Sequence, residues 1–233
     1  MIISYELKYM FVHVPKAAGT SIRNLLSINP LFKPDVLASW DGIKDSDYER
    51  FPKLTKELKS HSPTTTGIEF LKTKGHNPDE YFKFGFIRNP WDKIVSLYFY
   101  SKNVLAKQFE GKEKTQGLNS IIKNSQKSFY DFVLDEYKEE SGSLSQDEKI
   151  IFNKNNLMLD FCGKFENIEE DMTKIVHEIF PYFKENPNFD CRWRLLKNNK
   201  TQHSHYKDYY NKETKKIISQ KFSRIIELGK YKF

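Results

Sequence analysis

The residues best suited to chemistry lie in the stretch from Tyr9 to Leu26, YMFVHVPKAAGTSIRNLL. An apolar segment enters a turn, and a helix is expected to begin at the hydroxyl residues Thr20 and Ser21. A helix N-terminus carries unpaired backbone N–H groups and about half a positive charge. Gly19 allows the backbone to approach a ligand closely, and Lys16 adds a mobile cation. The stretch therefore suits a phosphate or a sulfate.

An ordinary strand-to-helix turn, capped by Thr20 or Ser21, would have the same pattern, and the stretch alone leaves both interpretations open. A Walker loop follows the pattern G-x-x-x-x-G-K-[ST], in which the lysine stands directly before the hydroxyl residue. In this chain Lys16 precedes Gly19. ATP is therefore not the expected ligand.

A second strand-to-helix junction repeats this plan. Residues 81–87 (YFKFGFI) have the apolar character of a buried strand, and Arg88 follows them. Asn89 suits a helix N-cap, Pro90 suits the first helical position, and Asp92 lies in the first turn, which favours acids. The planar guanidinium of Arg88 suits a phosphate at this position, and an ion pair at the protein surface is the alternative.

The elements that must position these residues alternate between strands and helices, which favours an α/β fold with a mostly parallel central sheet. A further strand is expected at residues 160–166. Residues 27–60 are predicted to be irregular, with FPKLTKELK as a possible short helix, and residues 106–126 to form a solvated loop or lid. Helices are expected at residues 62–71, 89–98, 129–138, 146–153, 169–180 and 212–228.

The composition indicates a folded protein with an anionic partner. A chain of 233 residues has room for one sizeable domain, and 38% hydrophobic with 15% aromatic residues is enough for a packed core. The formal net charge of +7 suggests a nucleic acid, a nucleotide or an acidic polysaccharide. Lysine and arginine are scattered among acidic residues instead of clustering with aromatics, which disfavours a nucleic-acid binder.

The cysteines and the N-terminus indicate the compartment. Cys162 and Cys191 are too few for a disulfide framework and form no C-x-x-C pair, so a reducing compartment fits best. The N-terminus lacks the pattern of a signal peptide, and no apolar run approaches the roughly 20 residues of a membrane helix. We therefore expect a cytoplasmic protein without stable membrane insertion, unless an anchor has been removed.

Four blocks, in this order, resemble sulfotransferases that use 3′-phosphoadenosine 5′-phosphosulfate: PKAAGTS, FGFIRNPWDKIVS, DFCGKFENIEED and TQHSHYKDYYNKET. The chain is most similar to the carbohydrate-directed group, which includes heparan 2-O, chondroitin and dermatan sulfotransferases and bacterial relatives. The resemblance implies a P-loop-like three-layer fold in a single sulfotransferase domain over residues 1–233. It also implies in-line transfer to a hydroxyl or, less favoured, an amine, with adenosine 3′,5′-bisphosphate as product and no required metal.

The same resemblance assigns roles to the positions that match the family motifs. Arg88 and Ser96 match the block that holds the 3′-phosphate, and Lys16 is implied to steady the departing 5′-phosphate during catalysis. The residues implied to hold the 5′-phosphosulfate are Lys16, Ala18, Gly19, Thr20 and Ser21. The late block adds further nucleotide contacts at Lys200, Thr201, His205 and Tyr206. A basic residue often found after the threonine is Gln202 in this chain, which puts that phosphate contact in doubt.

A histidine is the expected general base, because an imidazole titrates near neutral pH. His61 lies between the two phosphate motifs and begins the sequence HSPT, which is similar to the family pattern H-[SA]-x-T. This position matches the catalytic histidine of the family. A loop histidine that caps the next helix is the alternative. His76 is expected in an exposed turn and His13 in the first strand, and Glu166 is the next candidate for the base.

The expected acceptor is a glycan or another small hydroxylated molecule, and the sequence specifies neither its identity nor the oligomeric state. Two other functions remain open. The first is a P-loop NTP-dependent kinase or transferase, which would need Mg²⁺. The second is a non-catalytic protein that binds a nucleotide or a polyanion.

Overall fold

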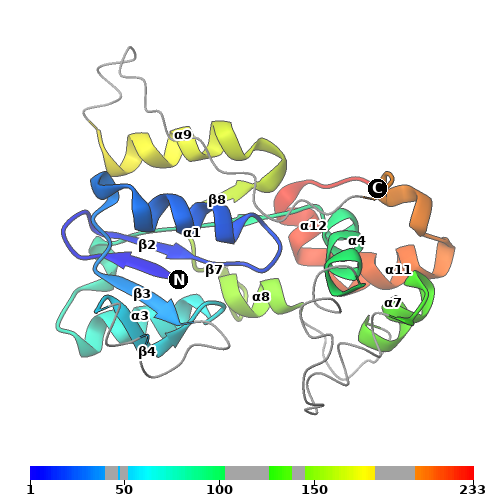
Figure 1. Ribbon diagram of the computed structural model, residues 1–233, viewed down its shortest axis with the longest axis horizontal. Helices are drawn as coiled ribbons and strands as arrows, with labels where there is room; N and C mark the ends of the chain where they lie inside the picture. Colours follow the sequence, from blue (N-terminus) through cyan, green and yellow to red (C-terminus); the bar gives the residue numbers. More distant parts are fainter. Residues whose placement is uncertain (40–46, 48–51, 103–125, 138–144, 182–202) are drawn as a thin grey trace. The chain divides into compact units, whose positions relative to one another are not determined.

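The computed structural model describes residues 1–39, 47, 52–102, 126–137, 145–181 and 203–233. The chain divides into two compact units, each built from two stretches of sequence. Unit 1 comprises Met1–Ile87 and Gln146–Asn198, and unit 2 comprises Arg88–Ser145 and Asn199–Phe233. Figure 1 labels the elements of both units.

Unit 1 contains a six-stranded sheet in the order β4-β3-β1-β2-β5-β8. In this sheet β1 is antiparallel to β2 and β3, whereas the pairs β2–β5, β5–β8 and β3–β4 are parallel. Five strands therefore run in one direction and β1 runs against them, which confirms the predicted mostly parallel α/β sheet. The strands are β1 (Ile2–Ser4), β2 (Tyr9–Val12), β3 (Val36–Ser39), β4 (Leu54–Lys59), β5 (Phe82–Ile87) and β8 (Phe161–Lys164).

The common direction brings the carboxyl ends of the strands to one edge of the sheet. At this edge β2 ends at Val12, β4 ends at Lys59 and β5 ends at Ile87. Val12 lies opposite Gly85 in the β2–β5 pair. After β2 the chain continues to β3 on one side, and β5 lies on the other side of β2. Ligands of α/β sheets bind beyond the carboxyl ends of the strands, at such a reversal of strand order.

Helices cover both faces of this sheet. On one face Tyr9 donates its hydroxyl to the carbonyl of Phe32 over 2.9 Å, and the Phe32 ring packs against Phe180 at 5.6 Å. These contacts attach η1 (Pro30–Phe32) and the end of α9 (Ile168–Ile179). On the other face α3 (Thr64–Thr73) approaches so closely that a Cβ on Gly67 would lie 2.6 Å from the sulfur of Met10. Figure 1 shows α1 (Gly19–Ile28) and α9 on one side of the sheet and α3 on the other, which completes three layers.

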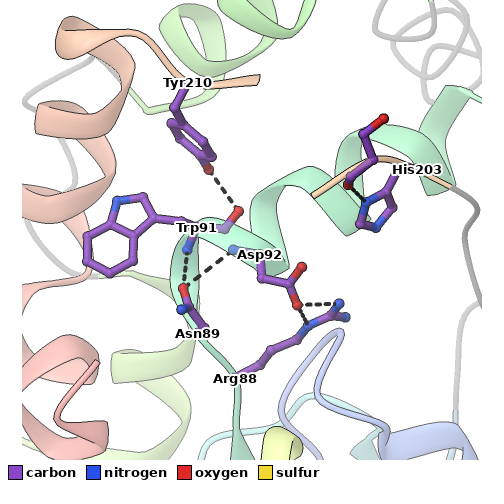
Figure 2. A network of polar contacts seen from close by, with 7 residues as sticks. Arg88, Asn89, Trp91, Asp92, His203 and Tyr210 are labelled. Atoms are coloured by element: carbon purple, nitrogen blue, oxygen red, sulfur yellow. Dashed lines mark hydrogen bonds and ion pairs between the residues drawn. The ribbon is translucent and has the colours of Figure 1, made fainter. Parts of the chain in front are cut away.

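Unit 2 is helical and has an aromatic core. It contains α4 (Pro90–Tyr100), α7 (Phe129–Tyr137), η5 (Tyr206–Tyr209), α11 (Lys212–Lys221) and α12 (Ser223–Gly229). The Tyr98 ring on α4 lies 5.5 Å from the rings of Phe129 and Phe132 on α7. Tyr210 ties the chain before α11 to α4, because its hydroxyl donates to the Trp91 carbonyl over 2.9 Å (Figure 2).

Most predicted elements are confirmed, but the prediction for residues 27–60 is wrong. That segment contains β3 and β4, and LTKELK (Leu54–Lys59) forms a strand within the stretch where a short helix was expected. Leu54 and Leu58 are both buried, and their spacing of four residues imitates one face of a helix. Side chains alternate along a strand, so the same spacing of four residues also places both leucines on one face of β4. Pairing with a neighbouring strand therefore outweighed local helix propensity.

Smaller differences concern the ends of the chain and the connections. The helix predicted over residues 212–228 is divided at Phe222 into α11 and α12. Strand β1 and the short hairpin of β6 (Phe152–Asn153) and β7 (Asn156–Leu157) were not predicted. The helix predicted over residues 146–153 is α8 (Gln146–Ile151), which ends two residues earlier. The predicted lid at residues 106–126 lies almost entirely outside the described residues. Among the helices that the structure describes, none has the length and apolar character to cross a membrane.

Candidate functional site

The loop between β2 and α1 has an unusual backbone. Lys16 and Ala18 have φ values of 59° and 60°, in the left-handed region, whereas Ala17 between them does not. Each such residue costs about 1–2 kcal/mol relative to the right-handed conformation. Successive N–H groups in alternating left- and right-handed residues point toward a common centre and form an anion-binding concavity. The positive φ values of Lys16 and Ala18 are what such a concavity requires of its left-handed residues.

The first turn of α1 lacks the groups that usually satisfy a helix N-terminus. Ala18 is the N-cap residue and provides no side-chain cap, and the first turn contains no acidic residue. The two predicted hydroxyl donors differ in accessibility, because Thr20 is exposed whereas Ser21 is 8% exposed. Lys16, which precedes Thr20 by four residues, is half-buried. The positive end of α1 is therefore not neutralised by its own first turn.

A neighbouring side chain fills the space in which a side chain at Gly19 would lie. A Cβ at this position would lie 1.8 Å from Cδ2 and 1.9 Å from Nε2 of His13, so the imidazole edge occupies the space of a side chain. Gly19 does not have a positive φ, and other residues could adopt its backbone conformation. The sequence analysis attributed this glycine to close approach of a ligand, whereas the contact in the structure is with His13.

His13 is a buried, uncharged imidazole. Its side chain is 9% exposed, and its Nδ1 is buried without a hydrogen-bond partner in the described part of the chain. Burial lowers the pKa of His13 well below the usual 6.5, and the nearby N-terminal amine, the His61 imidazole and the Arg23 guanidinium lower it further. The ring is therefore neutral at physiological pH.

His61, the predicted base, lies directly beside this arrangement. Its Nδ1 is 2.9 Å from the carbonyl oxygen of His13, and the two ring centroids are 4.6 Å apart. Because a carbonyl oxygen only accepts, Nδ1 of His61 carries the proton and donates it. In the neutral ring Nε2 is then the basic nitrogen. Since His13 also contacts Gly19, the structure brings His61 and the α1 loop together within unit 1.

Several hydrogen bonds fix the turn that follows β4 and carries this imidazole. The N–H of Ser60 donates to the carbonyl of Ser39 over 2.6 Å, and its hydroxyl donates to the same oxygen over 3.1 Å. The hydroxyl of Ser62 accepts from the N–H of Lys59 over 2.9 Å. Arg23 donates from Nη1 to the hydroxyl of Ser60 over 3.1 Å. The imidazole of His61 therefore lies on a turn that is hydrogen-bonded to both β3 and α1.

Arg23 was missed in the sequence analysis. It is largely buried, and desolvation lowers its pKa to about 10. The available signal was its spacing, because Arg23 follows Gly19 by four residues and so lies one helical turn along the same face of α1. On that face of α1, the guanidinium of Arg23 reaches the turn that contains Ser60 and His61.

At the second predicted phosphate site, in unit 2, side chains already bond to the arginine and to the helix N-terminus (Figure 2). Arg88 places Nε at 2.8 Å and Nη2 at 2.7 Å from Oδ2 of Asp92, and the two side chains are 11% and 24% exposed. The side chain of Asn89 accepts from the N–H groups of Trp91 and Asp92 over 3.0 and 3.5 Å. Ser96 lies further along α4 and is 3% exposed. The N-terminus of α4 is thus capped, and Arg88 has an acidic partner.

The late block is described in part, since Lys200 and Thr201 lie outside the described residues. His205 caps η5 by accepting at Nδ1 from the N–H of Lys207 over 3.4 Å. The Tyr206 ring lies 4.6 Å from the His205 ring and 5.7 Å from that of Phe233. Among the described residues, no group of three or more His, Cys, Asp or Glu side chains is placed to hold a metal ion.

The comparison with known families decides where this chain belongs. A sequence model of the sulfotransferase family matches residues 1–228, nearly the whole chain. The chain belongs to the sulfotransferase family.

Two individual proteins are similar to this sulfotransferase-family chain. An uncharacterized protein of Archaeoglobus fulgidus is 33% identical over 101 residues, which are 43% of this chain and 69% of that protein. Among solved structures, mouse sulfotransferase SULT7A1 complexed with PAP aligns with a TM-score of 0.43 and 14% identity, over 96% of this chain and 86% of the mouse chain.

Proposed function

We propose that this sulfotransferase-family chain transfers a sulfuryl group from 3′-phosphoadenosine 5′-phosphosulfate to a hydroxyl, or less readily an amine, of a glycan or glycan-like acceptor. The observation that carries the proposal is the placement of His61 next to the α1 loop, with Nδ1 bonded to the His13 carbonyl at 2.9 Å. A base beside an anion-binding loop is what sulfuryl transfer to a hydroxyl requires. The carbohydrate-directed subtype rests on the resemblance of the four sequence blocks.

The α1 loop fits the 5′-phosphosulfate. Its N-terminal N–H groups have no side-chain cap or acid from their own first turn, and the left-handed residues Lys16 and Ala18 shape a concavity for an anion. We assign Lys16, Ala18, Gly19, Thr20 and Ser21 to this half of the cofactor. Of the two hydroxyl side chains, the exposed Thr20 is the better donor to a ligand.

The fit to the 3′-phosphate depends on Arg88. A guanidinium can bind a phosphate through two parallel N–H bonds, but Nε and Nη2 of Arg88 already both donate to one oxygen, Oδ2, of Asp92. We propose that the phosphate shares or replaces this carboxylate and that Ser96 adds a hydroxyl from α4. His205 and Tyr206, with Lys200 and Thr201, are assigned to the nucleoside and its 3′-phosphate. No metal is needed for this assignment.

The residues of the chain divide the work of transfer among them. When bound, the cofactor supplies an activated sulfuryl group on a phosphate leaving group. His61 takes the proton of the acceptor hydroxyl at Nε2, because Nδ1 is already protonated and bonded to His13. Lys16 places positive charge where negative charge develops on the leaving side, and the loop N–H groups stabilise the equatorial oxygens.

We further propose that residues 1–233 act as one sulfotransferase domain in the cytoplasm. The family match covers residues 1–228, and each compact unit is built from two interleaved stretches of chain. Cys162 is a free thiol, in keeping with a reducing compartment.

Calorimetric titration with adenosine 3′,5′-bisphosphate tests the proposal most directly. We expect tight binding without a metal and weaker binding of ATP with Mg²⁺. Arg88→Ala should weaken the bisphosphate about tenfold or more but leave 5′-AMP nearly unchanged, because only the former carries the 3′-phosphate. Equal losses for both ligands would contradict the role of Arg88, and preferential binding of ATP with Mg²⁺ would favour an NTP-dependent transferase.

A sulfate-transfer assay then separates an enzyme from a nucleotide-binding protein. His61→Ala should lower kcat by about 10²- to 10⁴-fold while bisphosphate affinity is retained. His76→Ala is the matched control, because that imidazole stacks on Tyr5 at 4.2 Å, away from the assigned groups. Equal activity of the wild type and the His61 variant would exclude His61 as the base and leave Glu166 as the next candidate.

A further inference from the structure

Arg23 has a contact that a purely structural residue would not need. It lies on α1, and its guanidinium is largely withdrawn from water, yet Nη1 donates to the side chain of Ser60, the residue before His61. Burying a guanidinium costs several kcal/mol, and well-packed apolar residues in its place are often as stable or more stable. A gain in stability is therefore a weak explanation for an arginine at this position. The bond instead joins the helix of the anion loop to the turn of the base.

His13 makes a second connection between the same two parts. Its carbonyl accepts from Nδ1 of His61, and its ring edge fills the space where a Cβ on Gly19 would stand. One residue thus contacts the base through its main chain and the loop through its side chain. The cost is visible at Nδ1 of His13, which is buried without a hydrogen-bond partner in the described residues.

We propose that Arg23 and His13 are positioning residues that hold the His61 imidazole, in one tautomer, at a fixed place beside the loop of residues 16–21. The inference rests on the proposed function, since it assigns these residues to that reaction. A misplacement of about 1 Å costs on the order of a hundredfold in rate, so two independent connections are enough to matter for catalysis. Neither residue touches the cofactor in this scheme, and both act through His61.

A double-mutant cycle between Arg23 and Ser60 tests the first connection. Arg23→Met keeps the aliphatic stem and removes the donors, and Ser60→Ala removes the acceptor. Both changes delete the bond between Arg23 and Ser60, and Ser60→Ala also deletes the bond from its hydroxyl to the Ser39 carbonyl. We expect Arg23→Met to lower kcat about tenfold, and the double variant to lose about as much as Ser60→Ala alone instead of the product of the two single losses. KM for the cofactor should stay within about twofold of wild type, since the loop is intact. Arg23→Lys should recover most of the rate.

The control is Arg224→Met on α12, which removes a guanidinium that we assign to no part of the machinery. Additive losses in the cycle would overturn the proposal. So would an unchanged kcat in Arg23→Met, or a loss confined to KM, because each would show that the bond does not place the base.

The tautomer of His61 provides a readout that is independent of turnover. The chain has six histidines, so ¹⁵N-labelled imidazoles can be assigned by NMR with single variants. In the wild type we expect the Nδ1–H form of His61 at pH 8. His13→Ala keeps the carbonyl acceptor but removes the ring that packs at Gly19, and Arg23→Met removes the bond to the turn, so in both variants we expect the carbonyl and the imidazole to lose their alignment and the second tautomer to appear. A single Nδ1–H form in both variants would overturn the proposal. Failure of the proposed function would instead appear as absent bisphosphate binding in the wild type, whichever tautomer is seen.

Discussion

The helices α1 and α4 follow neighbouring parallel strands, yet only α4 has a side-chain cap at its N-terminus. At α4, Asn89 caps two N–H groups, and Asp92 lies in the first turn and pairs with Arg88. At α1, the N-cap is Ala18, which provides no cap, and no acid follows. At α4 the partial positive charge of the helix N-terminus is thus offset by its own first turn, whereas at α1 no residue of the first turn offsets it. An anion can be bound by the backbone at α1, but at α4 it must compete with a carboxylate for an arginine.

The two ends also differ in their contribution to stability. A capping side chain such as Asn89 stabilises a helix by about 1 kcal/mol, and a left-handed non-glycine residue costs about 1–2 kcal/mol. The α1 loop contains two of the latter, Lys16 and Ala18. Unfavourable backbone conformations persist where the surroundings hold them, and they cluster at ligand sites. The α1 junction is therefore locally less stable than the α4 junction, as we expect of a site that binds a ligand.

The largest expected effect comes from filling the space beneath the α1 loop. Gly19→Ala would place Cβ 1.8 Å from the His13 ring, so the loop or the ring must move. We expect sulfate transfer to fall at least about a hundredfold and the free energy of unfolding to drop by about 1–3 kcal/mol. Transfer assays and urea denaturation measure the two effects.

Gly75→Ala is the matched control for that substitution. Gly75 has a φ of 78° and no atom within 4 Å of its would-be Cβ, so alanine there introduces backbone strain without a clash. We expect a loss of stability of about 1 kcal/mol and unchanged transfer. Similar activities of the two variants would show that the contact between Gly19 and His13 is unimportant.

An intermediate effect should separate the two helix ends. Asn89→Ala should lower the free energy of unfolding by about 1 kcal/mol, because it uncaps α4. Thr20→Ala should change stability by less than about 0.5 kcal/mol and weaken adenosine 3′,5′-bisphosphate about fivefold, because its hydroxyl serves a ligand and not the helix. Thermal denaturation and calorimetry on both variants provide the comparison. An equal loss of stability would mean that Thr20 caps α1.

The smallest effect concerns pH and the ring under the α1 loop. Folding lowers the pKa of His13, so the unfolded state binds more protons below pH 6.5 and stability falls as the pH falls through that value. His13→Phe removes this contribution and keeps an aromatic ring. Between pH 7 and pH 6 we expect the wild type to lose about 0.7 kcal/mol more than the variant. Urea unfolding of each protein at both pH values measures the difference, and equal losses would show that His13 is not held neutral.

Local rules were enough to predict β2, β5 and the capped start of α4. Strand β2 is a continuous apolar run, and β5 is apolar and aromatic apart from Lys83 and Gly85. The capping signal of Asn89 and Pro90 is contained in adjacent residues. Strands β3 and β4 were not predictable in the same way. The exposed lysines and the leucine spacing of LTKELK suit a helix, and the strand exists because β3 pairs with it.

In the candidate site, too, some residues could be predicted from local sequence and others only from contacts between distant segments. Lys16, Gly19 and the hydroxyl residues could be found from one contiguous pattern, and His61 from resemblance to a family. The contacts of His61 with His13 and of Arg23 with Ser60 join residues 48 and 37 positions apart. No periodicity or motif encodes such distant pairs, so their role could be recognised only in the folded chain.

These sequence separations also have a consequence for the order in which the protein folds. The turn that carries His61 follows β4, and β3 and β1 separate β4 from β2 in the sheet. Bringing such distant segments together requires closing long loops, and the entropy lost in doing so is recovered only when the sheet has formed. The helix of the anion loop, by contrast, needs only local contacts to begin. We therefore expect α1 to begin forming early during refolding and a correctly placed His61 to be among the last features acquired.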